Sequence, residues 1–260
     1  MKEAILSLLQ RLLGFENYLY LFGWYKIQTI HRDRRERDFF TFLSMIPDHG
    51  VVLDIGANLG VMTVHLSRHV RRGEVVAFEP VPSNVAILRR FVARYRLANV
   101  RVEECALGDR EGSVQMVLPV ERGARRHGLS HVVHETITER NEGQHFSVPM
   151  RRLDDFASLW SGDSKPPVTG IKMDVENFER FVIEGAMETL RVHRPLLYIE
   201  LWPNENRRRC LELLNGLGYQ AFVCEHGRLT PFEPDRHAQQ NFIFRGSRPN
   251  RDSAPDSATR

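Results

Sequence analysis

The stretch Val51–Gly60, which reads VVLDIGANLG, decides the fold of this 260-residue chain. It starts as an apolar run with the length of a buried strand and passes through Asp54 into a turn with spaced glycines. A helical pattern follows at Val61–Val70. In open α/β sheets, ligands bind beyond the carboxyl ends of the strands. We therefore expect the turn after Ile55 to face a ligand.

Strand-like runs and helical patterns alternate from Pro47 to Arg245. This alternation predicts an α/β fold, with a mostly parallel sheet that helices cover on both faces. The expected strands are Val51–Ile55, Glu74–Phe78, Val100–Glu104, Gly170–Asp174, Leu196–Leu201, Tyr219–Cys224 and Asn241–Arg245. The expected helices are Val61–Val70, Ser83–Leu97, Glu179–Val192 and Asn204–Leu217.

The chain divides into three parts by composition. Residues 1–40 form a predicted N-terminal helical extension, 41–245 the main domain, and 246–260 a polar tail that we expect to be disordered. Apolar residues at helical spacing predict that the extension packs on the main domain. A helix that binds a membrane surface or a partner is the alternative.

An insert at about 113–150 interrupts the alternation. Two strand-like runs, Ser113–Leu118 and Phe146–Met150, are typical of a β-hairpin and flank the polar segment Glu121–Gln144, which is rich in Arg and His. Long loops in compact domains are usually functional. We interpret the segment as a lid or an acceptor-recognition element, with a solvated loop as the alternative.

The composition excludes several classes of protein. With 36 basic and 33 acidic residues and a net charge of +3, the chain is neither a disordered polyelectrolyte nor a coat for nucleic-acid backbones. Cys105, Cys210 and Cys224 are too scattered for a disulfide framework or a cysteine zinc site. The apolar stretch Ala4–Phe15 is too short for stable membrane insertion. We therefore expect a cytoplasmic protein.

The turn after Ile55 favours a nucleoside over a dinucleotide. A nicotinamide fingerprint needs glycine at the positions of Gly56, Asn58 and Val61, and only the first position has it. Glu79 closes the second strand, and a carboxylate there can accept hydrogen bonds from both ribose hydroxyls. Together these features indicate S-adenosyl-L-methionine. Gly56 and Gly60 would admit its aminoacyl end, while Asp54 would face its ammonium.

Several separated motifs resemble those of the FkbM family of S-adenosylmethionine-dependent methyltransferases, from about Asp38 to Arg245. The resemblance implies a Rossmann-like, seven-strand class I methyltransferase sheet and, for most members, O-methylation of hydroxyl groups on small molecules or glycans. The motifs are Leu53–Asn58, Ala77–Pro80, Asn99–Val100 with Ala106–Asp109, Arg152–Asp155, Ile171–Glu176 and Asn241–Phe244. The predicted cofactor-binding residues are Asp54, Gly56, Ala57, Asn58, Gly60, Glu79, Pro80, Asn84, Ala106 and Leu107.

One residue departs from the family pattern D-V-E-G-x-E, because Asn177 stands where the family usually has glycine. Asparagine tolerates the left-handed backbone region better than other residues with a side chain. We therefore expect the turn to persist, with a side chain that narrows the acceptor pocket.

Three carboxylates are the predicted catalytic residues. Asp174 follows the fourth strand and would position or deprotonate the acceptor, with Glu176 and Glu200 in support. We predict no metal site; a divalent cation held by these three acids is the alternative. His131 and His226 are further candidates for a base.

The sequence therefore predicts O-methylation of a small molecule, sugar or secondary metabolite, with a small-molecule or glycan acceptor and no nucleic-acid partner. Methylation of a nucleic acid or protein is the first alternative, and an inactive module that binds S-adenosylmethionine is the second. Arg and His in the insert favour an anionic or polyhydroxylated acceptor. The oligomeric state leaves no mark in the sequence.

Overall fold

The computed structural model describes residues 2–121, 124–125, 127–137, 142–162, 165–225 and 227–246. Almost all of the predicted disordered tail lies outside these residues. So do His226 and three arginines of the insert, namely Arg122, Arg126 and Arg140.

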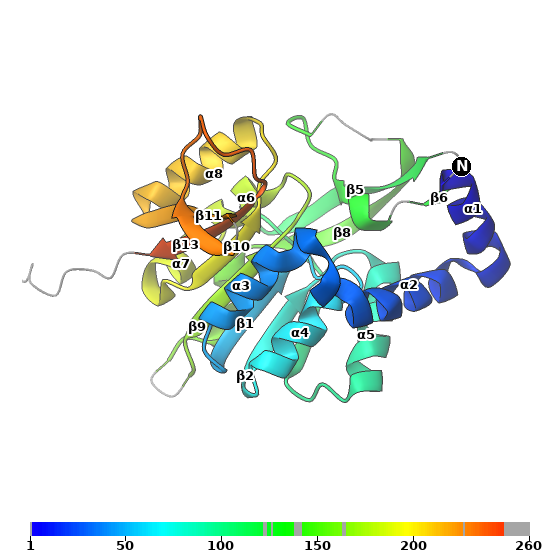
Figure 1. The fold of residues 1–260 in the computed structure, drawn as a ribbon, viewed down its shortest axis with the longest axis horizontal. Coiled ribbons are helices and arrows are strands. Elements are labelled where there is room, and N and C mark those ends of the chain that lie inside the picture. Colours follow the sequence, from blue (N-terminus) through cyan, green and yellow to red (C-terminus); the bar gives the residue numbers. More distant parts are fainter. Residues whose placement is uncertain are drawn as a thin grey trace, which may run out of the picture.

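The main sheet has eight strands in the order β12-β11-β13-β10-β9-β1-β2-β3 (Figure 1). The five strands β10, β9, β1, β2 and β3 are parallel, and β13 runs antiparallel to both β10 and β11. This confirms the predicted α/β sheet and all seven expected strands. The strands are β1 His49–Ile55, β2 Arg72–Phe78, β3 Val100–Glu103, β9 Val168–Met173, β10 Leu196–Glu200, β11 Tyr219–Glu225, β12 Arg228–Pro231 and β13 Asn241–Gly246.

The eighth strand, β12, was not expected. It forms a hairpin with β11, and Gly227, at φ 79°, lies in the turn between them. The strand is short and ends in Pro231. Proline has no backbone N–H to donate, so within sheets it is found at edge strands such as this one. These same features hide the strand from a pattern-based prediction.

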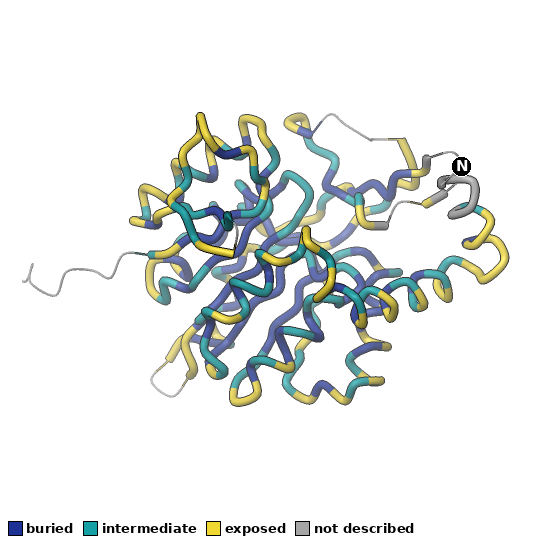
Figure 2. Tube along the Cα trace, in the orientation of Figure 1, coloured by how far each residue is buried: buried dark blue, intermediate teal, exposed yellow. Residues whose placement is uncertain are grey.

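Helices cover both faces of the sheet (Figures 1 and 2). On one face, Phe39 and Phe42 of α3 and Leu66 of α4 pack against strand residues such as Val52 and Tyr198. The other face packs against α6, α7, α8 and the insert. The helices of the main domain are α4 Val61–His69, α5 Pro82–Tyr95, α6 Glu179–Glu184, α7 Met187–His193 and α8 Glu205–Gly216, with a 3-10 helix at Leu153–Leu159.

The expected helix Glu179–Val192 is divided in two at Gly185. A side chain on Gly185 would place its Cβ 1.9 Å from the Gly108 carbonyl oxygen, so only glycine allows this close approach. Asp154, from a distant part of the chain, caps the N-terminus of the second helix: its carboxylate accepts hydrogen bonds from the Glu188 and Thr189 amides at 3.0 and 2.9 Å. Asp154 is thus a helix cap.

The insert is a small second sheet rather than a hairpin alone. Its long pair, β5 Gly112–Glu121 and β8 Gly143–Arg151, is antiparallel as expected. β4 (Ala106–Leu107) pairs with β8, while β6 (Ala124–Arg125) and β7 (His131–Val132) pair with β5. A 3-10 turn at His127–Leu129 precedes β7.

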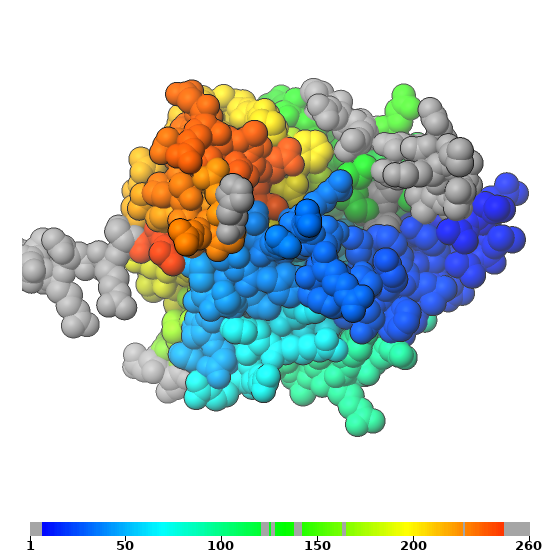
Figure 3. Space-filling view, in the orientation of Figure 1, coloured from blue at the N-terminus to red at the C-terminus, as the bar shows by residue number. Residues whose placement is uncertain are grey.

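The N-terminal segment forms α1 Lys2–Leu13, α2 Phe15–Thr29 and α3 Arg37–Met45, with 3-10 turns at Ile30–Arg32 and Arg34–Glu36 between α2 and α3. Figure 3 shows this segment lying across one face of the molecule. Leu19 and Ile27 of α2 are buried against helices α4 and α5. Within the part of the chain that the structure describes, none of the helices has the length and apolar character that a membrane crossing requires.

Helix α1 joins the N-terminal segment to the insert. The Gln10 side chain exchanges two 3.0 Å hydrogen bonds with the backbone of Arg125, one from its amide nitrogen and one to its oxygen. The Arg125 guanidinium lies 4.7 Å from the centre of the Phe15 ring. Two segments that are distant in the sequence therefore meet beside the sheet.

We predict that Asp154→Ala lowers the free energy of unfolding by about 1–3 kcal/mol, because it removes the cap of α7. Urea denaturation measures this effect. The control is Asp155→Asn, which weakens a partly solvent-exposed ion pair with Arg152. It should lower the free energy of unfolding by less than about 1 kcal/mol. Equal losses in the two variants would contradict the capping role of Asp154.

Candidate active site

The turn after β1 depends on left-handed backbone at alternate residues. Gly56, Asn58 and Gly60 have φ angles of 73°, 52° and 83°. A Cβ on Gly56 would lie 1.8 Å from the Asp174 carbonyl oxygen, and one on Gly60 would lie 2.4 Å from the Leu88 side chain. Gly56 therefore lets the ends of β1 and β9 come together, and Gly60 lets the turn approach α5.

A row of three buried polar side chains crosses the sheet just below its carboxyl edge. Asp54 on β1, Lys172 on β9 and Tyr198 on β10 are partners in the strand register and are 0%, 3% and 4% exposed. Parallel register places such residues on the same face. The row lies directly beneath the predicted site.

Lys172 and Asp54 form a buried ion pair, with 3.3 Å between Nζ and Oδ1. Lys172 Nζ also donates a 2.7 Å hydrogen bond to the Gly56 carbonyl, and Thr63 donates one of 2.6 Å to Asp54. Burial opposes the charged ammonium, but the carboxylates of Asp54 and Asp174 outweigh it and raise the pKa of Lys172. We expected Asp54 to face a ligand, but its side chain is fully buried and pairs with Lys172, which the sequence pattern did not single out.

A narrow pocket, the Glu79 pocket, lies between the main sheet and the insert. Its walls include most of the predicted cofactor residues, namely Gly56, Asn58, Glu79, Pro80, Asn84, Ala106 and Leu107. Met116, Ser130 and Val132 of the insert close it, which leaves about 60 Å³ of free space. Ala57 lines a neighbouring cavity instead.

Glu79 is held by three donors in this pocket. Its carboxylate accepts hydrogen bonds from the Asn58 amide at 2.7 Å, the Val81 amide at 3.0 Å and the Asn84 side chain at 3.1 Å. Burial raises the pKa of Glu79 to about 7, although these donors oppose the rise. The Asn84 oxygen is buried and has no hydrogen-bond partner among the described residues. A ligand with hydroxyl or amino donors would satisfy it.

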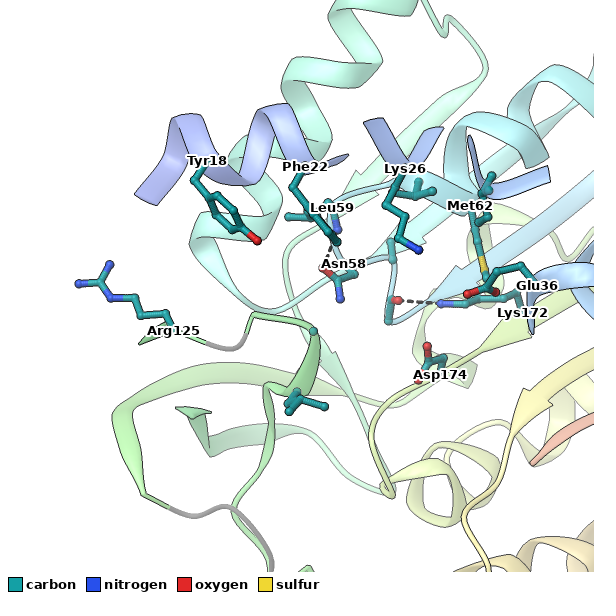
Figure 4. Close-up of a pocket in the computed structure, with 16 residues that line it drawn as sticks. Tyr18, Phe22, Lys26, Glu36, Asn58, Leu59, Met62, Arg125, Lys172 and Asp174 are labelled. Atoms are coloured by element: carbon teal, nitrogen blue, oxygen red, sulfur yellow. Dashed lines mark hydrogen bonds between the residues drawn. The ribbon is translucent and has the colours of Figure 1, made fainter. Parts of the chain in front are cut away.

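Two larger cavities adjoin the Glu79 pocket. The α2 cavity, of about 430 Å³, lies beneath Tyr18 and Phe22 of α2 and is flanked by Arg125 of the insert (Figure 4). The carboxylate cavity, of about 560 Å³, is lined by the acids Glu36, Asp38, Asp174 and Glu200. Asp174 lines all three spaces, so it stands where they meet.

The structure brings two of the three predicted catalytic acids into one cavity. Asp174 and Glu200 share the carboxylate cavity, whereas Glu176, at φ 53°, lines the Glu79 pocket. Burial and the neighbouring charge of Asp174 raise the pKa of Glu200 to about 7. The sequence did not point to Glu36, which comes from the N-terminal segment. Burial raises the pKa of this carboxyl group. Its sequence neighbours in Arg32–Asp38 are all charged, as in an ordinary solvent-exposed segment, so the pattern does not mark Glu36 as a site residue.

The turn after Asp174 persists with asparagine, as expected. Asn177 has a φ of 77°, but its side chain accepts a 2.7 Å hydrogen bond from Asn204, the N-cap residue of α8, instead of lining any of the three cavities. Glu179 secures the same turn, since its buried carboxylate accepts a 3.0 Å bond from the Val175 amide. Burial raises the pKa of Glu179 to about 8.

Two remaining expectations concern metals and histidines. Within the described residues, no group of three or more His, Cys, Asp or Glu side chains is arranged to hold a metal ion. His131 is buried in the insert, with its Nδ1 2.9 Å from the Leu129 carbonyl oxygen.

Comparison with known proteins gives the family of the chain. The family profile described as "Methyltransferase FkbM domain" matches residues 54–223, which is more than half of the chain. This protein belongs to the FkbM methyltransferase family. The match runs from the buried Asp54 to β11, and so contains the glycine turn, the insert and all the predicted site residues.

Individual relatives are distant. Methyltransferase sdnD from Sordaria araneosa is 25% identical over 74% of this chain and 83% of its own length. Methyltransferase 1 from Beauveria bassiana is 26% identical over 54% of this chain. The match spans only 59% of the length of that relative. The FkbM methyltransferase crystal structure from Methylobacillus flagellatus has a TM-score of 0.48 at 19% identity, over 76% of this chain and 44% of its own.

We predict that Lys172→Met lowers the free energy of unfolding by about 3–5 kcal/mol, because it leaves Asp54 buried without a counter-charge. The double variant Asp54→Asn with Lys172→Met should recover at least half of this loss. Urea denaturation measures both effects. Arg191→Ala removes a solvent-exposed pair with Glu188 and is the control, with an expected loss below about 1 kcal/mol.

Proposed function

We propose that the protein transfers a methyl group from S-adenosylmethionine to a hydroxyl group of a small acceptor. The observation that carries the proposal is the position of Asp174, at the carboxyl end of β9, where the Glu79 pocket meets the carboxylate cavity. One space suits a nucleoside, the other suits a polar acceptor, and the acid lies between them. Membership of the FkbM family supports the same reaction.

The residues of the Glu79 pocket fit the cofactor. Glu79 would accept hydrogen bonds from the ribose hydroxyls, and the unpartnered Asn84 oxygen would accept one from a donor of the nucleoside. Ala106, Leu107 and Val132 supply apolar walls for the base. The free space of about 60 Å³ is narrow for a nucleoside, and an outward shift of the insert would widen it.

The bound cofactor supplies an electrophilic methyl group, and the chain supplies position and a proton acceptor. Ionised carboxylates only accept hydrogen bonds. A hydroxyl group held between Asp174 and Glu200 would therefore point its proton at one of these two carboxylates. With a pKa of about 7, Glu200 can accept the hydroxyl proton near neutral pH. Lys172 keeps the turn and the end of β9 together beneath these groups.

A small acceptor is favoured over a nucleic acid. Four carboxylates line the acceptor side of the site, and they would repel a phosphate backbone. The α2 cavity is bounded by two aromatic side chains and can hold an apolar part of the acceptor. An inactive binding module would have no need of a proton acceptor at the meeting point of the three spaces.

We predict that the affinity for S-adenosylhomocysteine rises about tenfold between pH 6 and pH 8. A carboxyl group with a pKa of about 7 is about 90% protonated at the lower pH and about 90% ionised at the higher. Only the ionised form of Glu79 accepts hydrogen bonds at both oxygens. Calorimetry measures the dependence, which Glu79→Gln should abolish while lowering the affinity at pH 8. A wild-type affinity that does not vary with pH would contradict the role of Glu79.

We predict that Asp174→Asn and Glu200→Gln each lower kcat at least about 100-fold, because each removes a group that positions or deprotonates the hydroxyl. The affinity for S-adenosylhomocysteine should stay within about threefold of wild type. Release of S-adenosylhomocysteine during methyl transfer gives the rate. Glu188→Gln, an exposed acid outside the site, is the matched control. Full turnover in either site variant would remove that residue from the mechanism.

A further inference from the structure

We propose that the acceptor carries a protonated amine near the hydroxyl group that is methylated, and that its simplest form is an amino sugar. This inference rests on the proposed function and assigns the carboxylate cavity to the acceptor. It goes beyond the family, which leaves the acceptor open.

The cavity is assembled from two strands and the N-terminal segment. Side chains two residues apart on a strand lie on the same face, so Lys172 with Asp174, and Tyr198 with Glu200, point toward one side of the sheet. The 3-10 turn Arg34–Glu36 and the first turn of α3 add Glu36 and Asp38 on that side. In Figure 4, Glu36 lies beside Lys172, and Asp174 lies below them.

The charges of the cavity are not balanced. Its lining has four carboxylates, those of Glu36, Asp38, Asp174 and Glu200, but only two cations, Arg35 and Lys172. Lys172 is already paired with Asp54, which is not part of the lining. Burial raises the pKa values of Glu36 and Asp38, and for Glu36 it outweighs the opposing charges of Lys26 and Lys172. A cationic ligand would complete the set.

Two polar side chains of the lining, Tyr198 and Gln239, have an oxygen with no hydrogen-bond partner among the described residues. The Tyr198 side chain is 4% exposed and packs against Phe39 and Phe42, yet its hydroxyl forms no hydrogen bond with any described residue. The buried oxygen of Gln239 likewise has no partner among the residues that the structure describes. Buried polar groups are normally bonded. Tyr198 can donate to a ligand oxygen, and Gln239 can accept from a ligand hydroxyl or amine.

These groups also explain why oxygen, and not nitrogen, would be methylated. Carboxylates around an amine favour its protonated form, which has no lone pair with which to attack. The hydroxyl oxygen therefore attacks the methyl carbon. Bound S-adenosylmethionine would supply the methyl group: its S–CH₃ bond would break as the C–O bond formed, which would leave a neutral thioether, and the Glu200 carboxylate would take the hydroxyl proton.

The charge of the cavity revises one expectation. Arg and His in the insert favoured an anionic or polyhydroxylated acceptor. Arg125, the one of these arginines whose side chain the structure describes, stacks on Phe15 and borders the α2 cavity. The carboxylate cavity disfavours an anion, although a polyhydroxylated ring remains compatible with Tyr198 and Gln239.

Three matched sugars test the proposal: methyl α-D-glucosaminide, methyl α-D-glucoside and methyl α-D-glucuronide, which differ mainly in charge. Calorimetry at pH 7.5 on the protein saturated with S-adenosylhomocysteine measures their binding. We expect the glucosaminide to bind about tenfold more tightly than the glucoside, a difference of about 1.4 kcal/mol. The glucuronide should bind most weakly. Equal binding of the three sugars, or no binding of the glucosaminide at about 50 mM, would overturn the amino-sugar assignment.

Variants separate the charge from the hydrogen bond. Glu36→Gln should reduce the preference for the glucosaminide to about threefold, and Asp38→Asn is a second charge variant in case the first fails to fold. Tyr198→Phe should weaken both sugars by a similar factor and leave the preference intact. An unchanged preference in both charge variants would contradict the proposal.

Affinity for S-adenosylhomocysteine is measured for every variant. If it is retained in the wild type while the sugars show no charge preference, only the acceptor assignment fails. If the wild type does not bind S-adenosylhomocysteine, the proposed function fails first.

Discussion

The buried pair between Lys172 and Asp54 is the interaction on which the rest of the site depends. An ammonium and a carboxylate that are almost fully removed from water are stable only because each has several partners. Lys172 also bonds the carbonyl of Gly56, so the pair ties the glycine turn of β1 to the neighbouring strand β9. The turn and Asp174 therefore keep a fixed relation, and this relation allows one acid to border both the Glu79 pocket and the carboxylate cavity.

Two segments outside the regular alternation complete this rigid centre. The insert supplies one wall of the Glu79 pocket, and the N-terminal segment covers the α2 and carboxylate cavities. They meet through Gln10 and the backbone of Arg125. The strand ends of the main sheet thus supply the base of these spaces, while the two added segments supply the rest of their walls.

Local patterns predicted the parts of the structure that local forces control. Apolar runs located the seven strands. The acid directly after the second strand, Glu79, stood out in the sequence, and the structure shows its carboxylate held by three donors. Contacts between distant parts of the chain were not predictable in this way. The helix break at Gly185 follows from its approach to Gly108, and Glu36 reaches the cavity only through the packing of α3. Lys172 was visible as a charge in an apolar strand, but its partner lies on another strand.

The row across β1, β9 and β10 also constrains how the sequence can change. A neutral residue at position 172 leaves a buried charge at position 54, and the reverse change leaves a buried ammonium, so either single step is strongly unfavourable. The two positions can be replaced only together, or not at all. The Tyr198 hydroxyl is not part of this ion pair, although its buried ring packs against Phe39 and Phe42. The charged pair is therefore expected to be inherited as a unit, whereas the hydroxyl at position 198 can be lost without leaving a buried charge unpaired.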